Sequence, residues 1–411
     1  MSAQFQIDQG SAASDREQRH AAQTVDVCQS GSLKNREFRW RESVAQVAYY
    51  SGALNLLGWI SQRYELQSDG RSWRPAIHRV ASPKFLILCY HRVGTEGIPY
   101  YCTLPTPQFE MQMKFLREHF RVVSLGQLCD ELMNPGSPGN AVAVTFDDGY
   151  SDLYTYALPV LRKYEIPATV YLTADCIESG EVAWYDKIFL ALQVAPAGPI
   201  DIPIRGAGRI ELDSPQQRID VGSQLVSVLR QTPALERNRF CADFERQVSL
   251  PAEKLTGRML TWKQIDEMRS AGIFFGSHTL SHPALSQLAA EDVERELRES
   301  KSLLESRLGE PVLDFAYPFG KPQDCGPIAE AVAARCGYRS AVTTTWGINR
   351  PGSNLHNLRR VQLGDERVPA KFGLQIQKTF LMPGDPAELP RAPSSQTMNR
   401  GRADSGTLVR G

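Results

Sequence analysis

The sequence predicts an α/β fold in which parallel strands and helices alternate around a barrel. Short apolar runs rich in β-branched residues alternate with segments whose apolar residues recur every three to four positions, the patterns of buried strands and of helices. Glycine closes several of the helical segments. The number of repeated βα units favours a parallel sheet closed into a barrel. Only residues from about 176 to 254 break this rhythm, and we interpret them as an α-rich insertion.

The expected elements follow one another from residue 85 onward. Strands are predicted at 85–90, 121–125, 141–146, 168–173, 273–277, 313–318 and 340–344. Helices are predicted at 108–120, 125–133, 147–165, 261–272, 290–309 and 326–337. Thr106-Pro107 is a typical start for the first of these helices.

Both ends of the chain are predicted to be disordered. The N-terminal stretch is rich in Ser, Gln and Arg, and the stretch from about residue 383 is rich in Pro, Gly and Ser. Neither shows periodicity. The expected division is a disordered segment at 1–40, a helical N-terminal extension at 41–83, the barrel at 84–365 and a largely disordered C-terminal extension at 366–411.

Residues 43–64 carry apolar groups at helical spacing, interrupted by Ser51-Gly52. Such a stretch usually packs on its own domain. A peripheral membrane contact is the less favoured alternative, because the polar face lacks the Lys and Arg enrichment of interfacial helices. The first residues lack the pattern of a secretory signal, and no run approaches the ~18 apolar residues of a membrane span. We therefore expect a cytoplasmic protein, with peripheral membrane association as the alternative.

Composition is that of an ordinary globular chain. Of 411 residues, 42% are hydrophobic and the formal net charge is +0, so the charge gives no reason to expect nucleic acid as a partner. Eight cysteines are scattered without a C-x-x-C pair, which favours reduced, packed thiols. The sequence does not predict an oligomeric state.

Two stretches concentrate residues with chemical potential. The predicted strand 141–146 ends in Asp147-Asp148-Gly149, which is either a simple turn or a pair of functional carboxylates at the carboxyl end of a strand. The predicted strand 273–277 is followed by His278 and His282. A spacing of four in a helical turn would place both imidazoles on one face, so a metal site with two histidines and one aspartate is expected. Metals in such sites keep an open position for a water that can attack a carbonyl.

These stretches carry a family resemblance. Residues 145–150 (TFDDGY) and 277–283 (SHTLSHP) resemble the first two signature motifs of the polysaccharide deacetylase family, which includes nodulation-type carbohydrate esterases and chitooligosaccharide deacetylases. Residues 88–93 (LCYHRV) and 184–186 (WYD) resemble elements of an exopolysaccharide-type subgroup. The resemblance covers about 84–365. It implies a distorted (β/α)7-type barrel and a metal-dependent hydrolase that removes N-acetyl groups from an acetylated polysaccharide or oligosaccharide, or from a lipid-linked precursor.

The resemblance also implies roles for individual residues. Asp148, His278 and His282 would bind a divalent ion, most simply zinc, with cobalt or nickel as alternatives. Asp147 would be the general base for the metal-bound water. The third family motif corresponds to residues 316–320 (AYPFG), which carries the YPxG pattern of the subgroup, so the backbone N–H of Phe319 would stabilise the oxyanion.

The sequence departs from the family at two positions. Ala316 stands where many members carry an arginine that orients the catalytic aspartate, and Arg360 is the candidate substitute, with a surface loop arginine as the alternative. The late Leu-x-His element that supplies the general acid is not clearly present. We expect His91 to protonate the leaving amine because it ends the first barrel strand; His356, in a polar loop, is the alternative.

Aromatic residues near the motifs are candidates for substrate binding. Trp184, Tyr185 and Trp346 could each stack on a sugar ring or equally belong to the core, and stacking is favoured for Trp184, which lies in the insertion. Tyr150 and Tyr317 lie within the motifs themselves. A non-catalytic carbohydrate-binding or assembly protein and a de-N-acylase of a small glycolipid remain alternative functions. The sugar, its linkage and the choice between N- and O-deacetylation stay open.

Overall fold

The barrel sheet contains seven parallel strands. The computed structural model describes residues 64–66, 73–75, 83–95, 103–134, 136, 139–202, 209–362 and 368–381. Within these residues the strand order is β12-β11-β10-β7-β6-β3-β13. The strands are β3 (Phe85–Tyr90), β6 (Ala141–Phe146), β7 (Ala168–Leu172), β10 (Ile273–Ser277), β11 (Asp314–Ala316), β12 (Ser340–Val342) and β13 (Val361–Gln362). All six neighbouring pairs are parallel, as the alternating pattern predicts.

The two outer strands of this order meet and close the sheet. A parallel bridge joins Val342 at the end of β12 to Leu358, just before β13. Leu358 donates its N–H to Ala341 O (2.9 Å) and accepts from Thr343 N at its carbonyl (2.8 Å). Closure rests on few bonds because β12 and β13 are short, which makes the barrel distorted, as expected.

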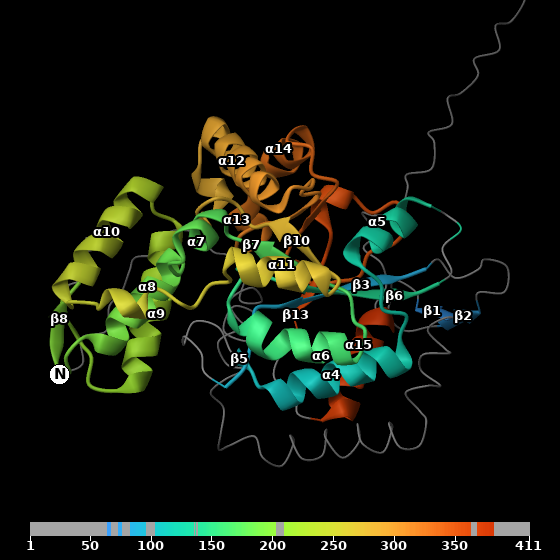
Figure 1. The fold of residues 1–411 in the computed structure, drawn as a ribbon, viewed down its shortest axis with the longest axis horizontal. Helices are drawn as coiled ribbons and strands as arrows, with labels where there is room; N and C mark the ends of the chain where they lie inside the picture. Colours follow the sequence, from blue (N-terminus) through green and yellow to red (C-terminus); the bar gives the residue numbers. More distant parts are fainter. Residues whose placement is uncertain are drawn as a thin grey trace, which may run out of the picture.

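Helices surround the strands. They are α4 (Thr106–His119), α5 (Leu125–Met133), α6 (Leu158–Lys163), α11 (Trp262–Ser270), α12 (Ala290–Leu308), α13 (Pro322–Cys325), α14 (Ala329–Arg335) and α15 (Pro369–Leu381). In α4, Phe109, Met113 and Leu116 recur on one face and are buried. A capping box between Thr261 and Gln264 begins α11. Figure 1 shows α4, α6 and α15 on one side of the barrel, with α12 and α14 on the opposite side.

The insertion between β7 and β10 is largely helical, as predicted. It comprises α7 (Ala174–Ser179), α8 (Trp184–Val194), the short antiparallel pair β8 (Pro199–Asp201) and β9 (Arg209–Glu211), α9 (Pro215–Arg230) and α10 (Ala234–Gln247). Figure 1 shows α8, α9 and α10 gathered beside the barrel. Phe189, Leu225 and Phe244 belong to the same hydrophobic cluster as the barrel residues, so the insertion shares the barrel core.

Several expected elements differ from the structure. Residues 121–125 form only a bridge from Val122 to Val142, because Ser124 instead caps α5 by accepting from Gln127 N. The predicted helix at 147–165 begins with a π-helical turn, Leu153–Ala157, before α6. The predicted C-terminal extension contains α15, whose Phe372 and Phe380 are buried.

Part of the predicted extension at 41–83 also differs. Its described residues include two short antiparallel strands, β1 (Tyr64–Leu66) and β2 (Trp73–Pro75), where a helical extension was expected. The remainder of 43–64, the segment 1–40 and residues 382–411 lie outside the described residues. Among the described helices, none combines the length and apolar character needed to span a bilayer. The six described cysteines are all free, as the sequence predicts.

Candidate metal and catalytic site

The predicted functional residues meet at the carboxyl ends of the barrel strands. Asp147 and Asp148 follow β6, His278 follows β10 and Phe319 lies in the turn after β11. In barrels of parallel strands the reactive groups lie at this end, because loops from several strands converge there.

Asp148, His278 and His282 form a compact group of ligand atoms. Asp148 Oδ1 lies 3.6 Å from His278 Nε2 and 3.5 Å from His282 Nε2, and all three side chains are buried. Tetrahedral ligands around zinc have O and N atoms about 3.3 Å apart, given bond lengths near 2.0 Å. Within the described residues, no hydrogen bond of ordinary length reaches either carboxylate oxygen of Asp148, and the neighbouring Tyr185 hydroxyl only partly opposes the effect of burial on its pKa. The geometry and this poorly compensated carboxylate fit a divalent ion.

The charges of the group lead to the same conclusion. Burial and the neighbouring Asp147 carboxylate raise the pKa of Asp148 well above its ordinary value. Burial lowers the pKa of His278 and His282, so both imidazoles are neutral at neutral pH, the form that binds a metal. A cation would compensate the buried carboxylate. The donor set suits zinc and also cobalt or nickel.

The loop that carries the two histidines is not helical, which corrects the expected helical turn. Residues 278–284 have an irregular conformation in which Thr279 and His282 adopt positive φ angles of 67° and 56°. His282 N donates to Thr279 Oγ1 (3.0 Å), which closes a tight turn between the ligands. Asp148 and Phe319 also have positive φ (72° and 59°). Four of the six described non-glycine residues with positive φ therefore belong to the site, where backbone strain commonly concentrates.

Three neighbours orient the histidine loop. His278 Nδ1 bonds Ala316 O (2.8 Å), which directs Nε2 toward Asp148. Glu296, on α12, accepts the backbone N–H groups of Leu280 and Ser281, each at 2.9 Å. Trp184 Nε1 donates to His282 O (3.1 Å). The sequence motifs did not reveal the part played by Glu296, because its helix reads as a charged surface helix.

Asp147 is held in place by Arg360. Arg360 Nη1 and Nη2 donate to the two oxygens of Asp147, each at 2.7 Å, and Arg360 Nε donates to Thr343 O (2.9 Å). Both residues are buried. Burial alone would raise the pKa of Asp147, but the Arg360 guanidinium holds it well below its ordinary value. Arg360 is thus buried against Asp147 and does not lie in a surface loop, and its role in orienting the catalytic aspartate stays a prediction.

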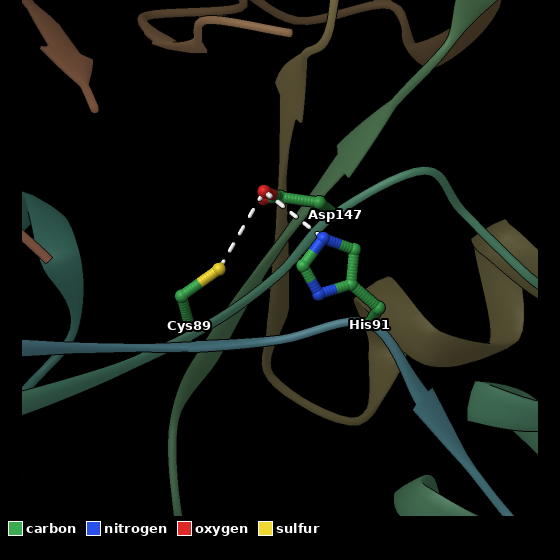
Figure 2. A group of neighbouring side chains, drawn as sticks. All are labelled: Cys89, His91 and Asp147. Carbon is green, nitrogen blue, oxygen red and sulfur yellow. Dashed lines mark hydrogen bonds and ion pairs between the residues drawn. The ribbon is translucent and has the colours of Figure 1, made fainter. Parts of the chain in front are cut away.

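Two further side chains face Asp147, as Figure 2 shows. The thiol of Cys89 donates to Asp147 Oδ2 at 3.6 Å, and His91 Nε2 lies 3.9 Å from the same oxygen. Burial lowers the pKa of His91 to about 4 although Asp147 opposes this shift. His356 is directed elsewhere, because its Nε2 bonds Tyr338 O before the start of β12. Cys89 was not predicted, since nothing distinguishes it from a packed strand cysteine.

The turn at Phe319 lies against the histidines. The Phe319 ring centroid is 4.9 Å from that of His282, and Thr344 Oγ1 donates to Phe319 O (2.7 Å). Gly320 follows with φ of 68°, and a Cβ there would meet Thr344 N at 2.6 Å, so no larger residue fits. Among the described residues, no group accepts the Phe319 N–H.

The aromatic residues expected to bind sugar are buried instead. Trp184, Tyr150 and Tyr317 are 7%, 1% and 1% exposed, so their rings offer no open face for stacking. Tyr150 donates to Asp186 Oδ2 (2.7 Å) and Tyr317 donates to His356 O (2.8 Å). The structure therefore places all three in the packing behind the site, which corrects the expected substrate contacts.

Comparisons with known proteins found similar sequences and structures. The protein-family model described as polysaccharide deacetylase matches residues 135–341. YxkH of Bacillus subtilis (strain 168), which is assigned to the polysaccharide deacetylases, is 22% identical over 313 residues, covering 76% of this chain and 81% of YxkH. A poly-β-1,6-N-acetyl-D-glucosamine N-deacetylase of Staphylococcus aureus is 32% identical over 97 residues, 23% of this chain and 33% of that protein.

A solved structure, the Streptococcus pyogenes deacetylase PplD, superposes with a TM-score of 0.49 at 22% identity, covering 73% of this chain and 99% of that one. The family model spans half of the chain and includes both Asp147-Asp148 and the histidine loop. On this match, the chain belongs to the polysaccharide deacetylase family.

Proposed function

We propose that this protein is a metal-dependent hydrolase that removes N-acetyl groups from sugar units of a polysaccharide or of its precursor. One observation carries the proposal: two adjacent buried carboxylates lie in opposite situations. Asp148 shares an uncompensated site with two imidazoles, whereas Asp147 is fixed and kept ionised by Arg360. The first suits a metal ligand and the second suits a general base.

A divalent ion held by Asp148, His278 and His282 would polarise the acetyl carbonyl and acidify a water molecule. Asp147 accepts the proton of that water as it attacks. Arg360 keeps both oxygens of Asp147 oriented during this step, because its guanidinium is itself anchored to Thr343 O. The Phe319 N–H then donates to the negative charge that develops on the acetyl oxygen.

His91 is the proposed acid for the leaving amine. Its low pKa leaves the imidazole neutral at neutral pH, so it must first receive a proton during the reaction. Asp147 Oδ2, 3.9 Å from Nε2, is the nearby source of that proton. A small approach of the two side chains brings them within hydrogen-bond reach.

The alternative of a non-catalytic carbohydrate-binding protein was motivated by the missing motif arginine. The buried pair of Arg360 and Asp147 supplies an equivalent contact from the residue just before β13, which favours an active enzyme. The Staphylococcus aureus relative is named for a polymer of N-acetylglucosamine, so such polymers are the first substrates to test. A de-N-acylase of a small glycolipid remains a second substrate class.

The test is release of acetate by the purified protein, first stripped of metal with a chelator and then assayed with and without an added divalent ion. Oligomers of β-1,6-linked and β-1,4-linked N-acetylglucosamine form two arms, and an N-acetylated glycolipid forms the third. Release from an oligomer that requires an added divalent ion supports the proposal. Metal-independent release, or no release from any arm while the ion is bound, would overturn it.

Metal content gives an independent readout. After dialysis against buffer without metal, elemental analysis should find about one divalent ion per chain, because three protein ligands bind it. His278→Ala should lose the ion. Equal metal in the wild type and in His278→Ala would show that the ion binds elsewhere.

A further inference from the structure

Cys89, His91 and Asp147 form a second group of potential ligands beside the first. Their ligand atoms all lie within 4.8 Å of one another, and Figure 2 shows the three side chains directed at one another. Cys89 and His91 are two residues apart at the end of β3, so their side chains leave the chain on the same side. We propose that this group is a second, inhibitory binding site for Zn²⁺, distinct from the site at Asp148.

The two separations to Asp147 Oδ2 are close to those of tetrahedral zinc. With a Zn–S bond of about 2.3 Å and Zn–N and Zn–O bonds of about 2.0 Å, S and O ligands lie about 3.5 Å apart, and N and O ligands about 3.3 Å apart. Cys89 Sγ is 3.6 Å from Asp147 Oδ2, and His91 Nε2 is 3.9 Å from that oxygen. The distance from the sulfur to Asp147 Oδ2 thus already matches that of a zinc site, and the imidazole must approach the same oxygen by roughly half an ångström.

Arg360 does not block this site. It donates to one lone pair of Asp147 Oδ2 at 2.7 Å, and the other lone pair accepts the Cys89 thiol, which gives it up to an ion when that thiol loses its proton. When Zn²⁺ binds, the Zn–S bond replaces the S–H bond of Cys89 and the thiol proton leaves to solvent. The thiolate and the carboxylate then carry two negative charges against the single positive charge of the guanidinium. The positive charge of the guanidinium lowers the affinity of this site for the ion, so the site fills only after the site at Asp148.

Occupation of this site would stop the reaction that we propose. The ion would take the lone pair of Asp147 that otherwise accepts the Cys89 thiol, and the Nε2 of His91, so it would occupy the proposed base and acid. Zinc would therefore activate the enzyme at low concentration and inhibit it in excess. This inference rests on the proposed function for its effect on activity, but the binding itself does not.

The test uses Co²⁺ as a spectroscopic substitute for Zn²⁺. The site at Asp148 has only oxygen and nitrogen ligands, so the first Co²⁺ gives no thiolate-to-metal charge-transfer band in the ultraviolet. Titration of the protein that already holds one ion should add a second Co²⁺ per chain together with this band. The matched control is Cys129→Ser, at a buried cysteine on α5 outside the site, and it should keep the band.

Cys89→Ser should lose the band and the second ion while keeping the first. If Cys89→Ser does not fold, Cys89→Ala and His91→Gln test the same ligands. Absence of the band in the wild type, or an unchanged band in a folded Cys89 variant, would overturn the inference. Because the band is read without substrate, its outcome is separate from any failure to release acetate.

Activity provides the second arm. In excess Zn²⁺ the wild type should lose most of its acetate release. Cys89→Ser should need a zinc concentration higher by about tenfold or more for the same inhibition, since even residues that only support a ligand alter metal affinity 10–100-fold. Equal inhibition of the two proteins would show that excess zinc acts elsewhere.

Discussion

The two halves of the site satisfy their carboxylates by opposite means. On one side, Asp148 is buried, no hydrogen bond of ordinary length from the described residues reaches its oxygens, and two imidazole nitrogens face it. On the other side, Asp147 receives two hydrogen bonds from Arg360 and one from the thiol of Cys89. Two residues that are adjacent in sequence and equally buried thus lie in contrasting electrostatic environments.

This contrast shows how one strand end supplies two different functions. The positive φ of Asp148 turns its side chain away from that of Asp147. Gly149 follows with φ of 85°, where a Cβ would meet Leu172 Cδ2 at 2.8 Å. The turn therefore requires glycine, and it directs Asp148 to the histidines while Asp147 stays in the barrel. The protein itself compensates the charge of Asp147, whereas a bound divalent ion would compensate that of Asp148.

The largest expected effect separates the two carboxylates by activity. Asp147→Asn should retain the bound ion but lose roughly 10²- to 10⁴-fold or more in rate, because the base is removed. Asp148→Asn should lose the ion as well. Acetate release and elemental analysis on both variants make the measurement. Similar metal content in the two variants would show that the roles are assigned wrongly.

The stability of the metal-free protein should distinguish the two variants in the opposite order, with Asp147→Asn now the more affected. Asp147→Asn leaves the buried Arg360 charge without its partner and should lower the free energy of unfolding by about 3–5 kcal/mol. Asp148→Asn replaces an uncompensated carboxylate by a neutral amide and should be neutral or stabilising. Urea unfolding of both metal-free variants tests this. The comparison fails if Asp148→Asn is the more destabilised protein.

The next effect distinguishes the proposed acid from the positioning arginine. Glutamine cannot deliver a proton, so His91→Gln should slow amide substrates by on the order of 10²-fold and activated esters far less, since their leaving groups need little help. Arg360→Ala should slow both alike, because it disturbs the base. The amide-to-ester rate ratio, with metal content as a control, is the measurement. An unchanged ratio in His91→Gln would exclude His91 as the acid.

Local patterns predicted most of the fold. Strands 85–90, 141–146 and 273–277 have the expected bounds. The first two are buried at every position, and the third is buried at every position except Phe274, which is exposed. Residues 121–125 have the same kind of pattern, yet Ser124 begins a helix there. In that segment Ser124 caps the helix that follows, so the residues do not continue as a strand. The pattern of apolar residues alone does not show whether a serine caps a helix.

The site was predictable where it depends on residue type and less so where it depends on distant contacts. Asp148 and His282 belong to short motifs, so their meeting followed from the strand order. The contact from Arg360 to Asp147 joins residues far apart in sequence. It was predicted only because Ala316 stands where many family members carry the arginine that orients the aspartate. Cys89 was missed, since its contact arises from side-chain direction inside the barrel.

The smallest expected effect tests the support of the metal half. Glu296 accepts two backbone N–H groups of the histidine loop, and its Oε1 also accepts Ser281 Oγ at 2.6 Å. A glutamine keeps one carbonyl oxygen but loses the charge and the second acceptor. Glu296→Gln should therefore weaken metal affinity by about tenfold, the lower end for residues that support a metal ligand.

The matched control for this change is Glu294→Gln on the same helix. Glu294 pairs with Arg298 at the surface, where an ion pair contributes little. Metal affinity measured by competition with a chelator should differ between the two variants while their unfolding midpoints stay close. If both variants bind the ion as tightly as the wild type, the histidine loop holds its conformation without Glu296. The turn between Thr279 and His282 would then be sufficient to position the ligands.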